Sequence, residues 1–89
     1  MFSEKRIMPT EREEKIARME TLKGYAEKAY DDMYEKAHSP SDATGYYSTA
    51  KESLYDAIRI AKELGLTEEA TKLEARLAHI KAVFRSQFC

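Results

Sequence analysis

Apolar residues recur at alternating steps of three and four along three consecutive stretches of the chain. This spacing places them on one face of an α-helix, which turns once in about 3.6 residues. The first stripe is Met19, Leu22, Ala26, Ala29 and Met33; the second is Tyr47, Ala50, Leu54, Ala57, Ala61 and Leu64; the third is Ala70, Leu73, Leu77, Ile80 and Phe84. A chain of 89 residues forms one domain, so the sequence predicts a single all-α domain of three amphipathic helices.

The first helix has a recognisable start. Thr10 and Glu13 stand three residues apart, as in a capping box, in which each side chain binds the backbone amide of the other residue. This pattern predicts a helix from residue 11 to about residue 37, after an N-terminal arm of residues 1–9. Acids placed four residues before bases support its exposed face. These pairs are Glu11 with Lys15, Glu14 with Arg18, and Asp32 with Lys36.

A second helix start lies at Ser39 and Pro40. Serine is a favoured cap, and proline fits the first helical position because the amide it lacks is unbonded there anyway. The helix is expected to run from 40 to 64. Ile58 and Ile60 flank its apolar stripe on both sides and widen the apolar face. A helix that contacts two neighbours needs such a face, so we expect this helix to be central.

The second helix is expected to stop at Gly65, because glycine tolerates the left-handed backbone of a helix end. Leu66 can cover the turn, and Thr67 is expected to cap a third helix that ends at about 86–88. Both connections are too short to cross the molecule, so consecutive helices run antiparallel. The predicted fold is an antiparallel up-down-up three-helix array or bundle over residues 10–88, either an open layer or a closed bundle.

The charge balance argues against two classes of partner. Lys and Arg number 15 and Asp and Glu number 16, for a net charge of −1. This balance lacks the positive excess that attracts nucleic acid or an anionic membrane, so we expect neither as a partner. No apolar run approaches membrane-spanning length. Cys89 is the sole cysteine, which excludes an intrachain disulfide and favours a reducing, cytoplasmic location.

The C-terminal part of the chain resembles a known helical repeat. Residues 57–65 read Ala-Ile-Arg-Ile-Ala-Lys-Glu-Leu-Gly and are followed by Glu69, Ala70 and the third apolar stripe. This arrangement is similar to the second helix of one tetratricopeptide repeat running into the first helix of the next, over roughly the last 35 residues. The family's Trp and its Leu-Gly pair on the following helix are missing. The resemblance implies binding of a peptide or partner protein on a helical groove.

Signals for catalysis or metal binding are sparse. Glu35 and His38 have the Glu-x-x-His spacing found in di-iron helical bundles. Such a site needs a second copy of the motif, and the other histidine, His79, has Arg76 rather than an acid three residues before it. Nor does the sequence assemble a Ser/His/Asp or Cys/His nucleophile arrangement. We therefore expect no catalytic residue, no metal and no cofactor.

The chain has six tyrosines and no tryptophan. Tyrosine combines apolar area with a polar tip and is enriched at protein interfaces. Tyr47 falls within the second stripe and Tyr30 borders the first, so both are expected in the core. Three others flank the stripes and are predicted to form an exposed partner-binding patch near the turn between the first two helices. They are Tyr34, Tyr46 and Tyr55.

These patterns favour a small non-enzymatic helical module for protein–protein interaction, acting on another protein or on a second copy of the chain. Small residues on the third helix offer a surface for self-association. They are Ala75, Ala78 and Ala82. Two alternatives stay open: a small helical enzyme that acts on an anionic metabolite, which requires inward-facing basic residues, and a regulatory protein associated with nucleic acid.

Overall fold

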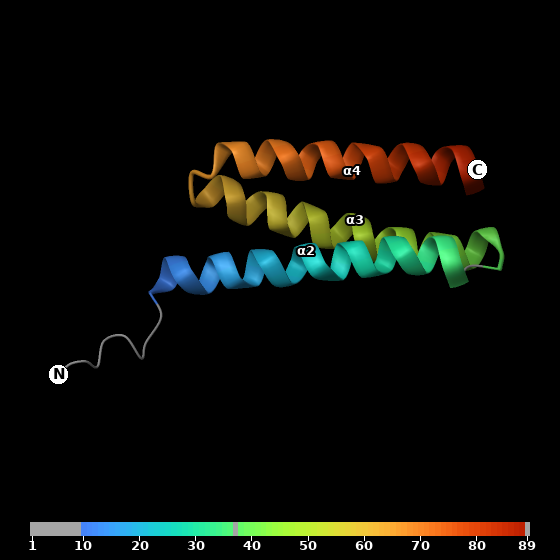
Figure 1. Cartoon of the computed structure of the whole chain (residues 1–89), viewed down its shortest axis with the longest axis horizontal. Helices are drawn as coiled ribbons and strands as arrows, with labels where there is room; N and C mark the ends of the chain where they lie inside the picture. The colour runs from blue at the N-terminus through green and yellow to red at the C-terminus, as the bar shows by residue number, and fades with distance from the viewer. Residues whose placement is uncertain (1–9, 37, 89) are drawn as a thin grey trace.

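The computed structural model describes residues 10–36 and 38–88, which form three long α-helices (Figure 1). These are α2 (Glu11–Lys36), α3 (Pro40–Glu63) and α4 (Thr67–Phe88), and the described residues contain no strand. Consecutive helices run antiparallel, which confirms the predicted up-down-up arrangement. None of these helices combines the length and apolar character needed to span a membrane. The predicted arm of residues 1–9, Ala37 and Cys89 lie outside the described residues.

The capping box at the start of α2 is formed in both directions. The amide of Thr10 donates to Glu13 Oε1 at 3.0 Å, and the amide of Glu13 donates to Thr10 Oγ1 at 3.1 Å. Two of the three predicted ion pairs along this helix are present. Lys15 Nζ lies 3.9 Å from Glu11, and Lys36 Nζ lies 3.6 Å from Asp32. Because these contacts join residues close together in the chain, the start of the helix could be predicted from the sequence.

The start of α3 has a similar arrangement. Ser39 Oγ accepts a hydrogen bond from the amide of Asp42 at 3.2 Å, as predicted, and Pro40 is the first helical residue. The carboxylate of Asp42 in turn accepts from the amide of His38 at 3.2 Å. Asp42 therefore binds the residue before the cap rather than the cap itself, so the arrangement differs from the reciprocal box of α2, and its carboxylate also lies at the positive end of the helix dipole.

The turn between α3 and α4 is a Schellman motif. Gly65 has φ of +75°, the left-handed conformation that favours glycine. Its amide donates to the carbonyl of Lys62 at 3.1 Å, and the amide of Leu66 donates to the carbonyl of Ala61 at 2.8 Å. Leu66 packs partly buried against the core, so the prediction that it covers the turn is confirmed.

The role predicted for Thr67 is wrong by one position. Thr67 is the first residue of α4 rather than its cap, and the carbonyl of Leu66 accepts the first helical amide, that of Ala70, at 2.9 Å. The tight Schellman turn is the physical reason. It lets α4 begin directly after Leu66, with no further residue needed to reverse the chain.

Of the three described helices, α3 packs closely against both others, as predicted. Leu54 is 1% exposed, and Ile58 and Ile60 are 7% and 5% exposed, so α3 buries a wide arc of its surface. Many of the buried residues of α2 and α3 are alanines, which let the two helices approach closely. They are Ala26, Ala29, Ala43, Ala50, Ala57 and Ala61. By contrast, α2 and α4 meet mainly through long side chains that reach across between them.

We expect Leu54→Ala to lower the free energy of unfolding by about 2–5 kcal/mol, the usual range for truncating a buried aliphatic side chain. Ile58→Ala should fall in the same range. Urea denaturation followed by circular dichroism measures both. Ala78→Ser, at an exposed position on α4, is the control and should change stability by less than about 0.5 kcal/mol. If the two core variants unfold like the control, α3 is not the centre of the core.

Ser39→Ala should lower the free energy of unfolding by about 1 kcal/mol, because the amide of Asp42 loses its acceptor. Ser41→Ala is the matched control, since Ser41 is an exposed serine within the first turn of the same helix. The same denaturation experiment compares them. Equal effects of the two substitutions would contradict the capping role of Ser39.

Candidate functional site

The three tyrosines predicted to bind a partner lie on three different surfaces. Tyr34, on α2, contacts the ring of Tyr30 edge-on at 5.5 Å between ring centroids, on the side that faces α4. Tyr46, on α3, lines a hollow beside α2, and Tyr55, on α3, contacts Lys81 of α4. The three tyrosines therefore do not form one patch, and each has a different set of neighbours.

The Tyr34 side is dominated by contacts that tie α2 to α4. Arg76 binds Glu27 through two hydrogen bonds, of 2.8 Å from Nε and 2.6 Å from Nη2, and its guanidinium lies 4.9 Å from the centroid of the Tyr30 ring. The hydrogen bonds to Glu27 raise the pKa of Arg76. Burial raises the pKa of Tyr30, whose hydroxyl lies 3.4 Å from Nε2 of His79.

A second tie lies about two helical turns toward the start of α4. Lys23 donates to Glu69 at 2.6 Å, and this hydrogen bond raises the pKa of Lys23. A groove of about 310 Å³ runs between the two ties. Its lining comes from all three helices: Lys23, Glu27, Leu54, Glu69, Lys72, Leu73 and Arg76. Most charges in this groove already have partners within the chain, so a ligand would have to break ion pairs to bind there.

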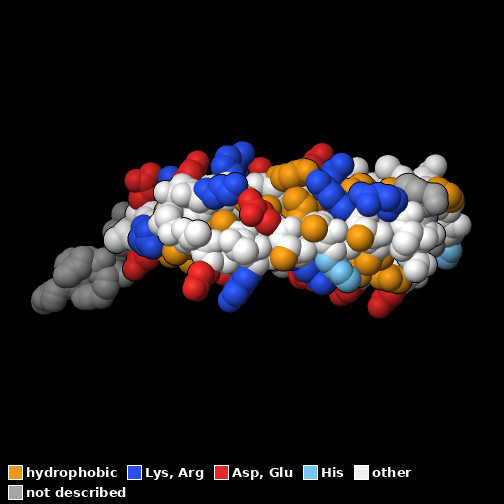
Figure 2. All heavy atoms as spheres, turned by 90° about the horizontal axis from the view of Figure 1, so that it is seen from above, with side chains coloured by type: hydrophobic (Ala, Val, Ile, Leu, Met, Phe, Trp, Pro, Cys, Tyr) orange, Lys and Arg blue, Asp and Glu red, His pale blue; other side chains and the backbone are white. Residues whose placement is uncertain are grey.

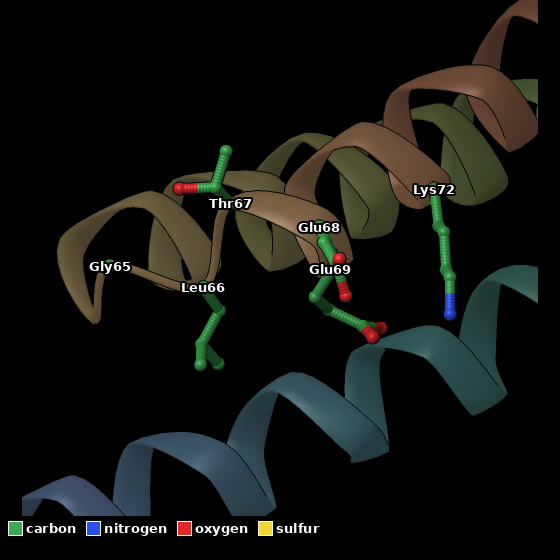
Figure 3. Close-up of a pocket in the computed structure, with 6 residues that line it drawn as sticks. All are labelled: Gly65, Leu66, Thr67, Glu68, Glu69 and Lys72. Atoms are coloured by element: carbon green, nitrogen blue, oxygen red, sulfur yellow. The ribbon is translucent and has the colours of Figure 1, made fainter.

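A hollow of about 450 Å³ lies at the start of α4 (Figure 3). Figure 3 shows the side chains of Leu66, Glu69 and Lys72 directed toward α2, while Thr67 points away from it. Two carboxylates, those of Glu68 and Glu69, already occupy the positive end of the helix dipole. They would repel an anion at this position, so we assign no ligand to it.

Tyr46 lines a smaller hollow, of about 260 Å³, between α2 and α3. Tyr25 lies on its other side and is 59% exposed. An ion pair of Lys28 with Asp32, 3.7 Å long, forms part of the wall. This hollow has aromatic walls, but its charges are balanced within the chain.

Tyr55 belongs to a compact cluster on α3 and α4, which we call the Tyr55 face: Tyr47, Lys51, Tyr55, Lys81 and Phe84. The rings of Tyr47 and Phe84 stack with centroids 4.1 Å apart and planes 4° from parallel. Lys51 Nζ lies 4.9 Å from the centroid of Tyr47, and Lys81 Nζ donates to Tyr55 Oη at 2.8 Å. The cluster thus combines stacked rings with two held ammonium groups.

The electrostatics of the Tyr55 face follow from these contacts. The hydrogen bond from Lys81 lowers the pKa of Tyr55, because the ammonium stabilises the phenolate, and the same bond raises the pKa of Lys81. Arg85, one turn along α4, is near enough to oppose the charge on Lys81. Within the described residues, Lys51, Lys81 and Arg85 make no ion pair with a carboxylate.

The surface seen from above α4 carries both charged and hydrophobic side chains (Figure 2). In Figure 2, which looks down onto α4, Lys and Arg side chains lie beside hydrophobic ones in the right half of the molecule. Tyr55 is 46% exposed, while Tyr47 and Phe84 are half-buried. The Tyr55 face therefore presents aromatic area and uncompensated positive charge together.

Sequence reasoning named Tyr55 but missed most of its face. It placed Tyr47 in the core, where the ring is half-buried and packs against the apolar cluster. The spacing of Tyr47, Lys51 and Tyr55 at steps of four was the available signal, because such residues share one side of a helix. Lys81 and Phe84 carry no signal of this kind, since only packing of α4 against α3 brings them to Tyr47 and Tyr55.

The remaining candidates are exposed. Glu35 and His38 both lie at the surface, and the described residues hold no group of three or more His, Cys, Asp or Glu side chains arranged to bind a metal ion. The alanines at 75, 78 and 82 form an exposed strip on α4.

A comparison with protein-family models, curated proteins and solved structures finds no match to this chain.

We expect Lys81→Met to raise the pKa of Tyr55, because the phenolate loses its hydrogen-bond donor and a nearby positive charge. Alkaline titration of protein labelled with carbon-13 at the tyrosine Cζ atoms resolves the individual rings by NMR. Lys72→Met, on another side of α4, is the control and should leave the Tyr55 titration unchanged. An unchanged titration in both variants would rule out the contact between Lys81 and Tyr55 in solution.

Proposed function

We propose that this chain is a small non-enzymatic helical interaction module that binds a segment of another protein on the Tyr55 face. The supporting observation is the combination of half-exposed aromatic rings with lysines that have no carboxylate partner among the described residues. Tyrosine is enriched among the residues that dominate binding energy at interfaces.

Preorganisation also supports this face. The stacked rings of Tyr47 and Phe84 are parallel and close, and Tyr55 is held by its hydrogen bond to Lys81. Side chains that are already held lose less conformational entropy when a partner binds. A partner segment laid along α3 and α4 would meet a surface whose main anchors are in place.

The other two surfaces are less suited to a partner. On the Tyr34 side, the ion pairs of Lys23 with Glu69 and Arg76 with Glu27 join α2 to α4, so binding in that groove would compete with contacts that hold the fold together. The Tyr46 hollow is small and its ion pair is internal. Of the three tyrosines, Tyr55 therefore lies on the surface best suited to binding a partner.

The proposal predicts that Tyr55→Ala weakens partner binding at least about tenfold, a loss of about 1.4 kcal/mol or more. Tyr34→Ala is the matched control, because Tyr34 is exposed to a similar degree, 51% against 46%, on a different surface. A library of random peptides displayed on phage is selected against the chain, and the selected peptides are measured by calorimetry on both variants. Circular dichroism checks that each variant is folded.

Two results would contradict this assignment. Peptides that bind Tyr55→Ala and the parent equally well would place the interface elsewhere. A dimer in light scattering that Tyr55→Ala dissociates would assign the face to self-association instead.

A further inference from the structure

We infer that the segment recognised by the Tyr55 face is acidic, with Asp or Glu side chains next to an apolar or aromatic one. This inference rests on the proposed function of the face and adds the chemistry of the partner. Its basis is the distribution of charge over the described surface, together with the geometry of the two lysines.

Ion pairs are frequent on the rest of the described surface. The cations that lie within 4.0 Å of a carboxylate are Lys15, Lys23, Lys28, Lys36, Arg59, Lys62 and Arg76. They include residues that border the Tyr55 face along α3, where Arg59 pairs with Asp56 at 3.4 Å and Lys62 pairs with Glu74 at 3.0 Å. The cations that border the face along α3 are therefore paired, whereas Arg12, Arg18 and Lys72 elsewhere on the described surface have no carboxylate partner among the described residues.

The lysines of the Tyr55 face form no such ion pairs with the described residues. Lys51 and Lys81 on the face have no carboxylate partner in the described part of the chain, and neither does Arg85, one turn along α4 from Lys81. Lys51 instead lies over the Tyr47 ring, and Lys81 donates to the neutral hydroxyl of Tyr55. A carboxylate adds the attraction between opposite charges, which neither the Tyr47 ring nor the Tyr55 hydroxyl supplies in full, so an incoming acid offers these ammonium groups better partners.

The geometry also indicates an apolar residue in the same segment. Lys51 and Lys81 are half-buried, so their alkyl chains lie along the surface and their ammonium groups are held beside the rings. The stacked pair of Tyr47 and Phe84 lies in the same cluster. A segment that places carboxylates on the lysines would lay a neighbouring side chain on these rings.

An acidic peptide fits this surface better than a nucleic acid or an anionic membrane does. The positive charge is local, because the whole chain has a net charge of −1. Polyanions gain affinity by neutralising many charges at once, and the acidic residues elsewhere on the chain would repel them. A short acidic segment needs only the few cations that the face supplies.

The test uses the displayed random-peptide library, with peptides about twelve residues long, and the full chain as bait. Peptides that bind the parent but not Tyr55→Ala define the pool for this face. We expect Asp and Glu to be enriched about threefold or more in that pool relative to the unselected library. Selection against the double variant Lys51→Gln, Lys81→Gln should lose this enrichment, and selection against Lys72→Gln should retain it.

One selected peptide is then compared with its version in which every Glu and Asp is replaced by Gln or Asn. We expect the amide version to bind about tenfold more weakly by calorimetry, with the difference removed in the double lysine variant. Lys72 is the matched control because it is an exposed cation on α4, has no ion pair among the described residues and lies outside the face.

The outcomes separate the inference from the proposed function. If the selected peptides depend on Tyr55 but are not acidic, the face binds protein and the inference is wrong. If no peptide depends on Tyr55, the proposed function itself fails. If a twelve-nucleotide oligothymidine or vesicles containing phosphatidylserine bind more tightly than the acidic peptide and also depend on Lys51 and Lys81, the face recognises polyanions in general and the inference is overturned.

Discussion

The packing of α3 against both of its neighbours is the contact on which the rest of the structure depends. Leu54 lies at its centre, 1% exposed, and Ile58 and Ile60 extend the buried arc to either side. Because α2 and α4 meet mainly through long side chains, neither could hold the other in place without α3. Apolar burial is the main favourable term in folding, and here α3 supplies much of it.

This arrangement gives the two sides of α4 different characters. On the side facing α2, ion pairs such as Arg76 with Glu27 join the helices and pair most of the charges in the groove between them. On the side formed with α3, Lys81 meets Tyr55, and its charge has no acidic partner among the described residues. The first side contributes to the fold. The second leaves aromatic area and positive charge at the surface, which is why we place the proposed interaction there.

The limits of each helix could be predicted because they depend on residues close together in the chain. Thr10 with Glu13 and Ser39 with Asp42 are three residues apart, and each pair satisfies backbone amides that the helix itself leaves unbonded. Gly65 ends α3 because its left-handed backbone needs no distant partner. The apolar stripes likewise report which side of each helix is buried, including the wide arc that makes α3 central. Only the cap of α4 was misplaced, by one residue.

The sequence by itself therefore determined the all-α class, the helix starts and stops, the antiparallel order and the central position of α3, because local capping and helical periodicity control all of them. Tertiary structure decided which tyrosines have which neighbours. Tyr34, Tyr46 and Tyr55 look equivalent along the chain, yet one lies beside the α2–α4 ties, one in a hollow and one against Lys81. Those neighbours come from helices distant in sequence, and their positions depend on how each helix is rotated about its own axis when the apolar faces pack together. A periodic pattern indicates which side of a helix is buried, but it does not indicate which residue of another helix will lie next to it.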